Sequence, residues 1–174
     1  MVNNRRKIGT QKYLAYLLLF LLLYVLQSTP GMLGVLGVRP VLLIPAAVTL
    51  AMYEGEFTGG LFGALAGMLC DLGAFSFYGL YSILLLCCTV AGGLLVIHLM
   101  RRTLRVAMLL TLGTAALCGL LRFYFDYGLW GYAGISRLFW EQSVPTAIYT
   151  TVVTPLFFYL FQRSTRYFAE KIST

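Results

Sequence analysis

The sequence has little charge and few groups suited to acid–base chemistry. Charged residues make up 11% of its 174 residues, only six residues are Asp or Glu, and there is one histidine. Soluble domains carry about a quarter charged residues. Because 60% of the residues are hydrophobic and the mean hydropathy is +0.83, the composition excludes an ordinary globular protein. The sequence therefore predicts an all-α integral membrane protein.

Motifs for catalysis and cofactor binding are also lacking. There is no phosphate-binding G-x-x-x-x-G-K-[ST] loop, no nucleophile with a base, and no pair of carboxylates deep in an apolar run. The four cysteines lack zinc-ligand spacing, and we interpret them as small packing residues. His98 stands close to Arg101 and Arg102, which favours an interfacial position over a metal or proton site. We expect neither enzymatic activity nor a cofactor.

Apolar runs divide the chain into helices. A bilayer core of about 30 Å needs about 20 helical residues. By this measure the sequence predicts one membrane domain with six spans, at 13–33, 40–53, 57–72, 78–99, 106–121 and 144–161. The polar and glycine-containing cluster at 28–31 should kink or end the first span, and Pro155 should kink the sixth. Glu54 and Glu56 should mark a turn, where carboxylates stay in water.

The net charge of +7 reflects basic clusters beside these apolar runs, so membrane orientation explains it better than nucleic-acid binding. Six spans put both termini on one side. Ten of the 13 basic residues fall on that side, and the other three are Arg39, Arg122 and Arg137. Because lysine and arginine are enriched in cytoplasmic loops, we expect both termini in the cytoplasm. Five spans would split the terminal basic clusters between two sides.

Small residues and one carboxylate stand out in the third span. Gly59, Gly63 and Gly67 are spaced by four and share a helix face, so another helix can approach closely. Packing within the bundle is favoured over a subunit interface. Asp71 continues this face four residues later. It is either solvated in a turn or paired with Arg39, which six spans place on the same outer side.

The segment between the fifth and sixth spans is rich in aromatic residues and is expected to be the longest loop. Its aromatic residues are Phe123, Tyr124, Phe125, Tyr127, Trp130, Tyr132, Phe139 and Trp140. Such side chains concentrate at membrane interfaces, so an interfacial belt is the favoured interpretation. A docking surface for a membrane-anchored partner, with Trp130 and Trp140 as candidates, is the alternative.

Short motifs along nearly the whole chain resemble one family. They are Arg39-Pro40-Val-Leu-Leu-Ile, the G-A-L-A-G-M-L-C-D stretch from Gly63 to Asp71, Phe77-Tyr78-Gly79-Leu80-Tyr81, Pro145, and Thr154-Pro155-Leu156-Phe157-Phe158-Tyr159. Together they resemble MreD, the rod shape-determining membrane protein family of bacteria. The resemblance implies backbone-shaping roles for Arg39, Pro40, Gly63, Gly67, Asp71 and Gly79, and a catalytic role for none of them.

The same resemblance implies a function and a set of partners. We expect a non-enzymatic scaffold subunit of the cell-elongation machinery in the bacterial cytoplasmic membrane. It would bind the single-span protein MreC and act with the actin-like MreB and peptidoglycan synthases. The family also suggests a six-helix bundle similar to the substrate-binding subunits of energy-coupling-factor vitamin transporters. A vitamin-binding subunit is therefore the main alternative function, and a lipid-modifying enzyme is a weaker one.

Overall fold

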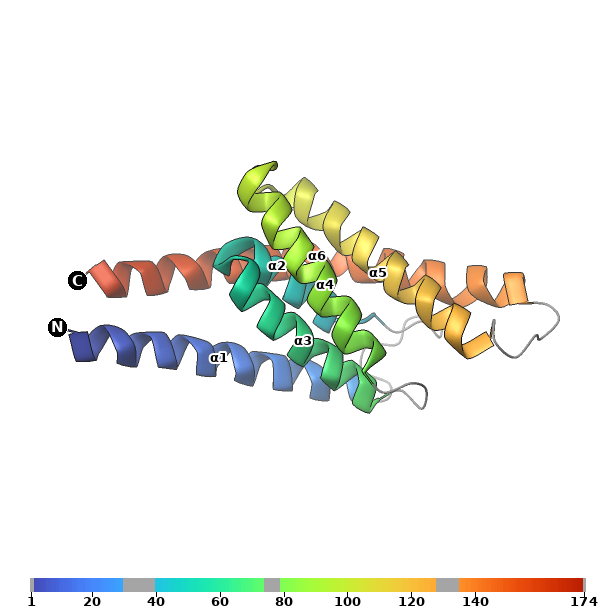
Figure 1. Ribbon diagram of the computed structural model, residues 1–174, viewed down its shortest axis with the longest axis horizontal. Coiled ribbons are helices and arrows are strands. Elements are labelled where there is room, and N and C mark those ends of the chain that lie inside the picture. The colour runs from blue at the N-terminus through green and yellow to red at the C-terminus, as the bar shows by residue number, and fades with distance from the viewer. Residues whose placement is uncertain (1, 30–39, 74–78, 128–134, 174) are drawn as a thin grey trace.

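The computed structural model describes residues 2–29, 40–73, 79–127 and 135–173. These residues contain six helices and no strand, so the chain is an all-α membrane protein (Figure 1). The helices are α1 (Val2–Ser28), α2 (Leu43–Glu54), α3 (Glu56–Leu72), α4 (Leu80–His98), α5 (Leu104–Tyr127) and α6 (Ile135–Ser173).

Four of these helices contain a stretch long and apolar enough to cross a membrane. The stretches are Thr10–Ser28, Leu80–His98, Leu104–Arg122 and Val144–Tyr167. The other two helices are shorter. With 12 residues, α2 is about 18 Å long, and α3 with 17 residues is about 26 Å long.

The short helix α2 lies at the centre of the bundle, where it contacts all five other helices. Every residue from Leu42 to Met52 is buried. A helix that is apolar on all sides is either a membrane span or is buried among other elements, and α2 is covered by its neighbours. Because its neighbours cover it, α2 has little need to match the thickness of the bilayer by itself.

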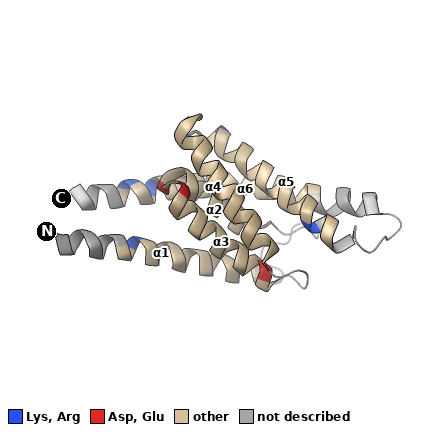
Figure 2. Ribbon diagram, viewed as in Figure 1, with Lys and Arg blue, Asp and Glu red and all other residues tan. Residues whose placement is uncertain are grey.

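The remaining helices form two pairs and one peripheral element. α3 and α4 make a hairpin that runs obliquely to α1 and α6, and α5 packs beside α6 (Figure 1). α1 lies alongside the C-terminal half of α6, and both termini lie at one end of the bundle. Among the described residues, lysine and arginine lie on α1 and α6 toward that end, and others lie where α4 and α5 meet and on α5 (Figure 2).

The first two helices differ from the predicted spans at their shared connection. α1 ends at Ser28, which confirms that the helix stops near the polar cluster, but its predicted extension to 33 falls on residues outside those described. α2 begins at Leu43 rather than at Pro40, which is buried just before it. The backbone N–H of Val41 donates to Thr150 Oγ1 of α6 at 3.2 Å. This contact with α6 adds to the backbone bonds that join the residues before α2 to its first turn, from Ile44 N–H to Val41 and from Ala46 N–H to Leu42.

The prediction of a long loop between the fifth and sixth spans is wrong. α5 continues to Tyr127 and α6 already begins at Ile135. The sequence argument measured apolar length, whereas a helix keeps its backbone hydrogen bonds after it leaves the hydrocarbon.

α6 also continues through Pro155 without ending, and the hydroxyls of Thr150 and Thr151 bond carbonyls one turn earlier.

Candidate functional site

Asp71 forms a polar site at the junction between α3 and α4. Its side chain is only 4% exposed. Oδ2 accepts hydrogen bonds from the backbone N–H of Gly79 at 3.0 Å and of Ser82 at 3.2 Å, and from the Ser82 hydroxyl at 3.2 Å. Oδ1 accepts from the N–H of Tyr81 at 3.2 Å. Asp71 therefore caps the start of α4 with a charge that the helix dipole favours.

This geometry decides between the two sequence interpretations of Asp71 only in part. The carboxylate is buried with partners, so the solvated-turn interpretation is wrong. Its described partners are backbone and hydroxyl groups of α4. The other proposed partner, Arg39, lies outside the described residues. Gly79 has φ +94°, a left-handed conformation that glycine adopts without strain, and this turn presents the amides to Asp71.

The glycine stripe of α3 lies against two different helices. A Cβ atom added at Gly59 would collide with Ala51 of α2, and one added at Gly67 would collide with the backbone of Ser82 on α4. At Gly63 an added Cβ would lie 2.9 Å from the carbonyl oxygen of Leu85 and would also meet Thr89. The stripe thus packs inside the bundle, as the spacing predicted.

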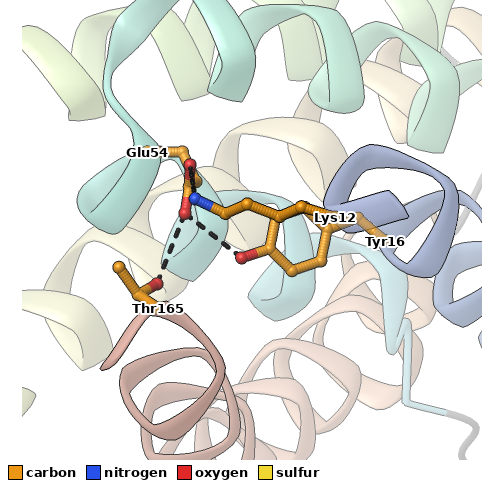
Figure 3. A network of polar contacts seen from close by, with 4 residues as sticks. All are labelled: Lys12, Tyr16, Glu54 and Thr165. Atoms are coloured by element: carbon orange, nitrogen blue, oxygen red, sulfur yellow. Dashed lines mark hydrogen bonds and ion pairs between the residues drawn. The ribbon is translucent and has the colours of Figure 1, made fainter. Parts of the chain in front are cut away.

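A second polar site joins α1, α2 and α6 at the end of the bundle where the termini lie (Figure 3). Lys12 Nζ donates to Glu54 Oε2 at 2.6 Å, and the Tyr16 hydroxyl donates to Glu54 Oε1 at 3.1 Å. The Thr165 hydroxyl also donates to Oε1, at 3.3 Å. We call these four residues the Glu54 cluster.

The Glu54 cluster corrects the interpretation of Glu54 as a solvated turn residue. The turn exists, because Gly55 separates α2 from α3 with φ +92°. However, the side chains of Lys12 and Glu54 are only 15% and 9% exposed. An ion pair with this little exposure is stable only when further hydrogen bonds satisfy its oxygens, which Tyr16 and Thr165 supply here. No sequence pattern indicated this pairing, because the two charged residues are 42 positions apart.

Arg122, one of the three basic residues predicted on the outer side, lies at the opposite end of the bundle. Arg122 Nη1 donates to the Tyr81 hydroxyl at 3.4 Å, and its guanidinium lies 5.9 Å from the centre of the Tyr81 ring. Tyr81 itself belongs to the capped start of α4. Of the aromatic candidates, Trp130 lies outside the described residues, and Trp140 lies in α6 with its side chain outside the description.

In both polar sites the carboxylate is engaged by contacts within the chain. Among the described residues, no group of three metal-binding side chains comes together, and the four cysteines are free thiols. Both carboxylates already bind donors of the same chain. Their chemistry is to fix helix positions at the two ends of the bundle. No protein-family model, curated protein or solved structure matches this chain.

Proposed function

We propose that this protein is a non-enzymatic scaffold subunit of the bacterial cell-elongation machinery, of the MreD kind, and that it binds an MreC-like single-span protein. In this proposal it lies in the cytoplasmic membrane with both termini in the cytoplasm. MreB and the peptidoglycan synthases act with the resulting complex, either through MreC or by direct contact.

The observation that carries this proposal is the arrangement of the residues on which the resemblance depends. Gly63 and Gly67 bring α4 onto α3, Asp71 caps α4, and Gly79 supplies the turn between them. Four residues of the resemblance thus serve one structural unit, the α3–α4 hairpin. A family whose characteristic residues shape a backbone is expected to act by presenting surfaces, because such residues leave no reactive group free.

The position of the basic residues supports the proposed orientation. Lys12 and Thr165 meet at Glu54, close to the two termini, whereas Arg122 lies with Tyr81 at the capped start of α4. This separation supports the proposed orientation, because the positive-inside rule expects the excess of lysine and arginine on the cytoplasmic side.

Copurification with the single-span partner tests the proposal. The full-length chain, tagged at one terminus, is coexpressed with the MreC-like protein of the same bacterium and purified in mild detergent. We expect a complex that survives size-exclusion chromatography, and loss of rod shape when the gene is deleted. An unrelated single-span protein expressed at the same level serves as the control and should not copurify.

Two results would contradict the proposal. One is a deletion strain that keeps its rod shape and a chain that captures the MreC-like protein no better than the control. The other is tight binding of a small vitamin together with a requirement for an ATPase module, which would favour the transporter-subunit alternative instead.

A further inference from the structure

The α3–α4 hairpin carries two rows of exposed apolar side chains, which together we call the hairpin face. The rows are Phe57, Leu61, Met68 and Leu72 on α3, and Ile83, Leu86, Leu94 and Ile97 on α4. Within each row the spacing follows the helical repeat, so each row runs along one side of its helix. Another side of α3 packs on α2, because a Cβ added at Gly59 would collide with Ala51.

Val90 joins the two rows into one surface. It lies four residues after Leu86 and four before Leu94, so it belongs to the α4 row. A Cβ added at Gly60 of α3 would lie 2.6 Å from Val90 Cγ2, so the α4 row borders α3 directly. One turn further along α3, Ala64 is partly exposed. The small residues at these two positions of α3 leave room for another helix to approach closely.

Glu56 lies at the end of the hairpin face that the proposed orientation places in the cytoplasm. A Cβ added at Gly93 of α4 would lie 2.9 Å from the Cα of Glu56, so the two residues pack against each other. Gly93 precedes the last apolar turn of α4, which ends at His98. Glu56 therefore lies beside a part of α4 that is still apolar.

The carboxylate of Glu56 differs from the others whose side chains the structure describes. Glu54 and Asp71 bind donors of the same chain. Glu56 is partly exposed, and among the described residues neither a hydrogen bond nor an ion pair engages its carboxylate. Because a carboxylate beside an apolar span is costly without a cationic partner, Glu56 favours the approach of a cation from another chain.

Other exposed apolar surfaces end at basic residues instead. The exposed side of α5 begins near Arg105, and that of α6 leads to Arg163 and Arg166, all three of which are exposed. A helix flanked by lysine or arginine would meet like charge there. Arg101 and Arg102 also lie at this end of the bundle, but they follow the end of α4 and so lie beyond the level of Gly93.

We propose that the hairpin face binds the membrane-spanning helix of the single-span partner, and that Glu56 pairs with a lysine or arginine at the cytoplasmic end of that helix. The inference rests on the proposed function, because its occupant is the partner named there. Single-span proteins carry their excess of lysine and arginine on the cytoplasmic side of the span. These long side chains reach along apolar surface to a charged partner.

A second copy of the chain fits this surface less well. Two copies in the same membrane that pair through the same face are related by a twofold axis along the membrane normal. This symmetry places both Glu56 carboxylates at the same end of the interface, where they repel each other. The charge of the hairpin face therefore favours a partner that brings a basic residue.

Bulky substitutions on two exposed sides of the bundle locate the binding surface. The full chain is titrated with the purified MreC-like protein of the same bacterium in mild detergent. Ala64→Trp should lower the affinity at least about tenfold, because the indole keeps the partner helix away from α3 and α4. Ala116→Trp, at an exposed position of α5, is the matched control and should lower it by less than about twofold.

Glu56→Gln provides a second test that keeps the shape of the side chain and the fold. The affinity should fall by about threefold to fivefold, because one ion pair at the rim of the interface is lost. Glu56→Lys should weaken binding further. Glutamate in place of the basic residue at the cytoplasmic end of the partner's span should restore the affinity of Glu56→Lys, which a purely structural role of Glu56 would not allow.

A photocrosslinking residue shows which molecule covers the hairpin face. Placed at Leu61, which is 57% exposed, it should crosslink to the MreC-like protein. At Leu120 of α5, which is 54% exposed, it should give little of this product.

The possible failures separate this inference from the proposed function. If the wild-type chain binds the MreC-like protein but Ala64→Trp and Ala116→Trp behave alike, the hairpin face is not the binding surface and the proposed function stands. Crosslinks from Leu61 to a second copy alone would also overturn the inference. Absence of binding by the wild-type chain would overturn both.

Discussion

The α3–α4 hairpin and helix α1 are held to the bundle in different ways. In the hairpin, glycines bring one backbone against another, so that an added Cβ at Gly67 or Gly63 would collide with α4. α1 instead reaches the bundle through a few large side chains. Tyr16, Phe20 and Leu23 are buried, and most of its other apolar residues are exposed.

The α3–α4 hairpin is therefore held by close contact between backbones. Helix α1 is held by side-chain contacts and one ion pair. The Tyr16 ring meets Phe62 at 6.0 Å and Phe161 at 5.6 Å, and the Glu54 cluster adds the ion pair of Lys12. Side-chain contacts can be lost and regained one by one, whereas close backbone packing is either present or absent. We therefore expect the hairpin to tolerate little change and α1 to be the element that loosens first.

The largest effect is expected where a side chain is forced between α3 and α4. Gly67→Leu and Gly63→Leu should each destabilise the protein by about 3 kcal/mol or more, because the opposing atoms include backbone that cannot rotate away. Thermal unfolding in detergent and the monodisperse fraction on size-exclusion chromatography measure the loss. Gly113→Leu on α5 is the matched control, because an added Cβ there meets nothing within 4 Å. Equal stability of Gly67→Leu and the control would refute the close packing.

A smaller effect is expected when α4 loses its cap. Asp71→Ala should cost about 2 kcal/mol, because four donors lose their acceptor, and Asp71→Asn should cost less because one oxygen remains. The exchange Arg39→Asp with Asp71→Arg should not rescue stability, since arginine accepts no hydrogen bond from the α4 amides. Recovery of full stability by this exchange in the same unfolding assay would show instead that a charge pair holds the site.

The attachment of α1 should respond to the loss of its ion pair. Glu54→Gln leaves the Lys12 ammonium with a neutral partner at a site that is 15% exposed, and should cost about 1 to 2 kcal/mol. A double-mutant cycle with Lys12→Met should give a coupling energy of about 1 kcal/mol. Glu56→Gln, which changes a neighbouring carboxylate, should cost only about 0.3 kcal/mol through the helix dipole. A coupling energy near zero would mean that the ion pair does not hold α1.

The smallest effect is expected from a single hydroxyl of the Glu54 cluster. Tyr16→Phe keeps the ring contacts with Phe62 and Phe161 and removes one hydrogen bond to Glu54 of 3.1 Å, so it should cost about 1 kcal/mol. The same change at Tyr13, which is 48% exposed, should be neutral. If the two variants have the same melting temperature, the hydroxyl of Tyr16 adds nothing to the attachment.

Local signals in the sequence were enough to predict the helices and the close packing. Apolar runs located all six helices, the Glu54-Gly55-Glu56 stretch located the turn between α2 and α3, and the spacing of Gly63 and Gly67 indicated where another helix approaches. Each of these features depends on residues within a few turns of one another. Hydropathy could not locate the ends of α5 and α6, because a helix does not stop where the apolar residues stop.

The polar sites were harder to predict because their partners are distant in the chain or belong to the backbone. Lys12 and Glu54 are 42 positions apart, and Thr165 is 111 positions from Glu54. For Asp71, the charge suggested an arginine, whereas the described partners are amides of α4. The available signal was the position of Asp71, eight residues before Gly79 at the start of α4, where a carboxylate can cap the helix.

Interhelical distances measured by electron paramagnetic resonance test the central difference most directly. Spin labels on exposed positions would report the α3–α4 pair from Leu61 and Ile83 and the α1–α6 pair from Leu18 and Leu160, in a background without the native cysteines. We expect Glu54→Gln to broaden the α1–α6 distance distribution while the α3–α4 distribution stays narrow and unchanged. Unchanged distributions for both pairs, or broadening of both alike, would contradict the account.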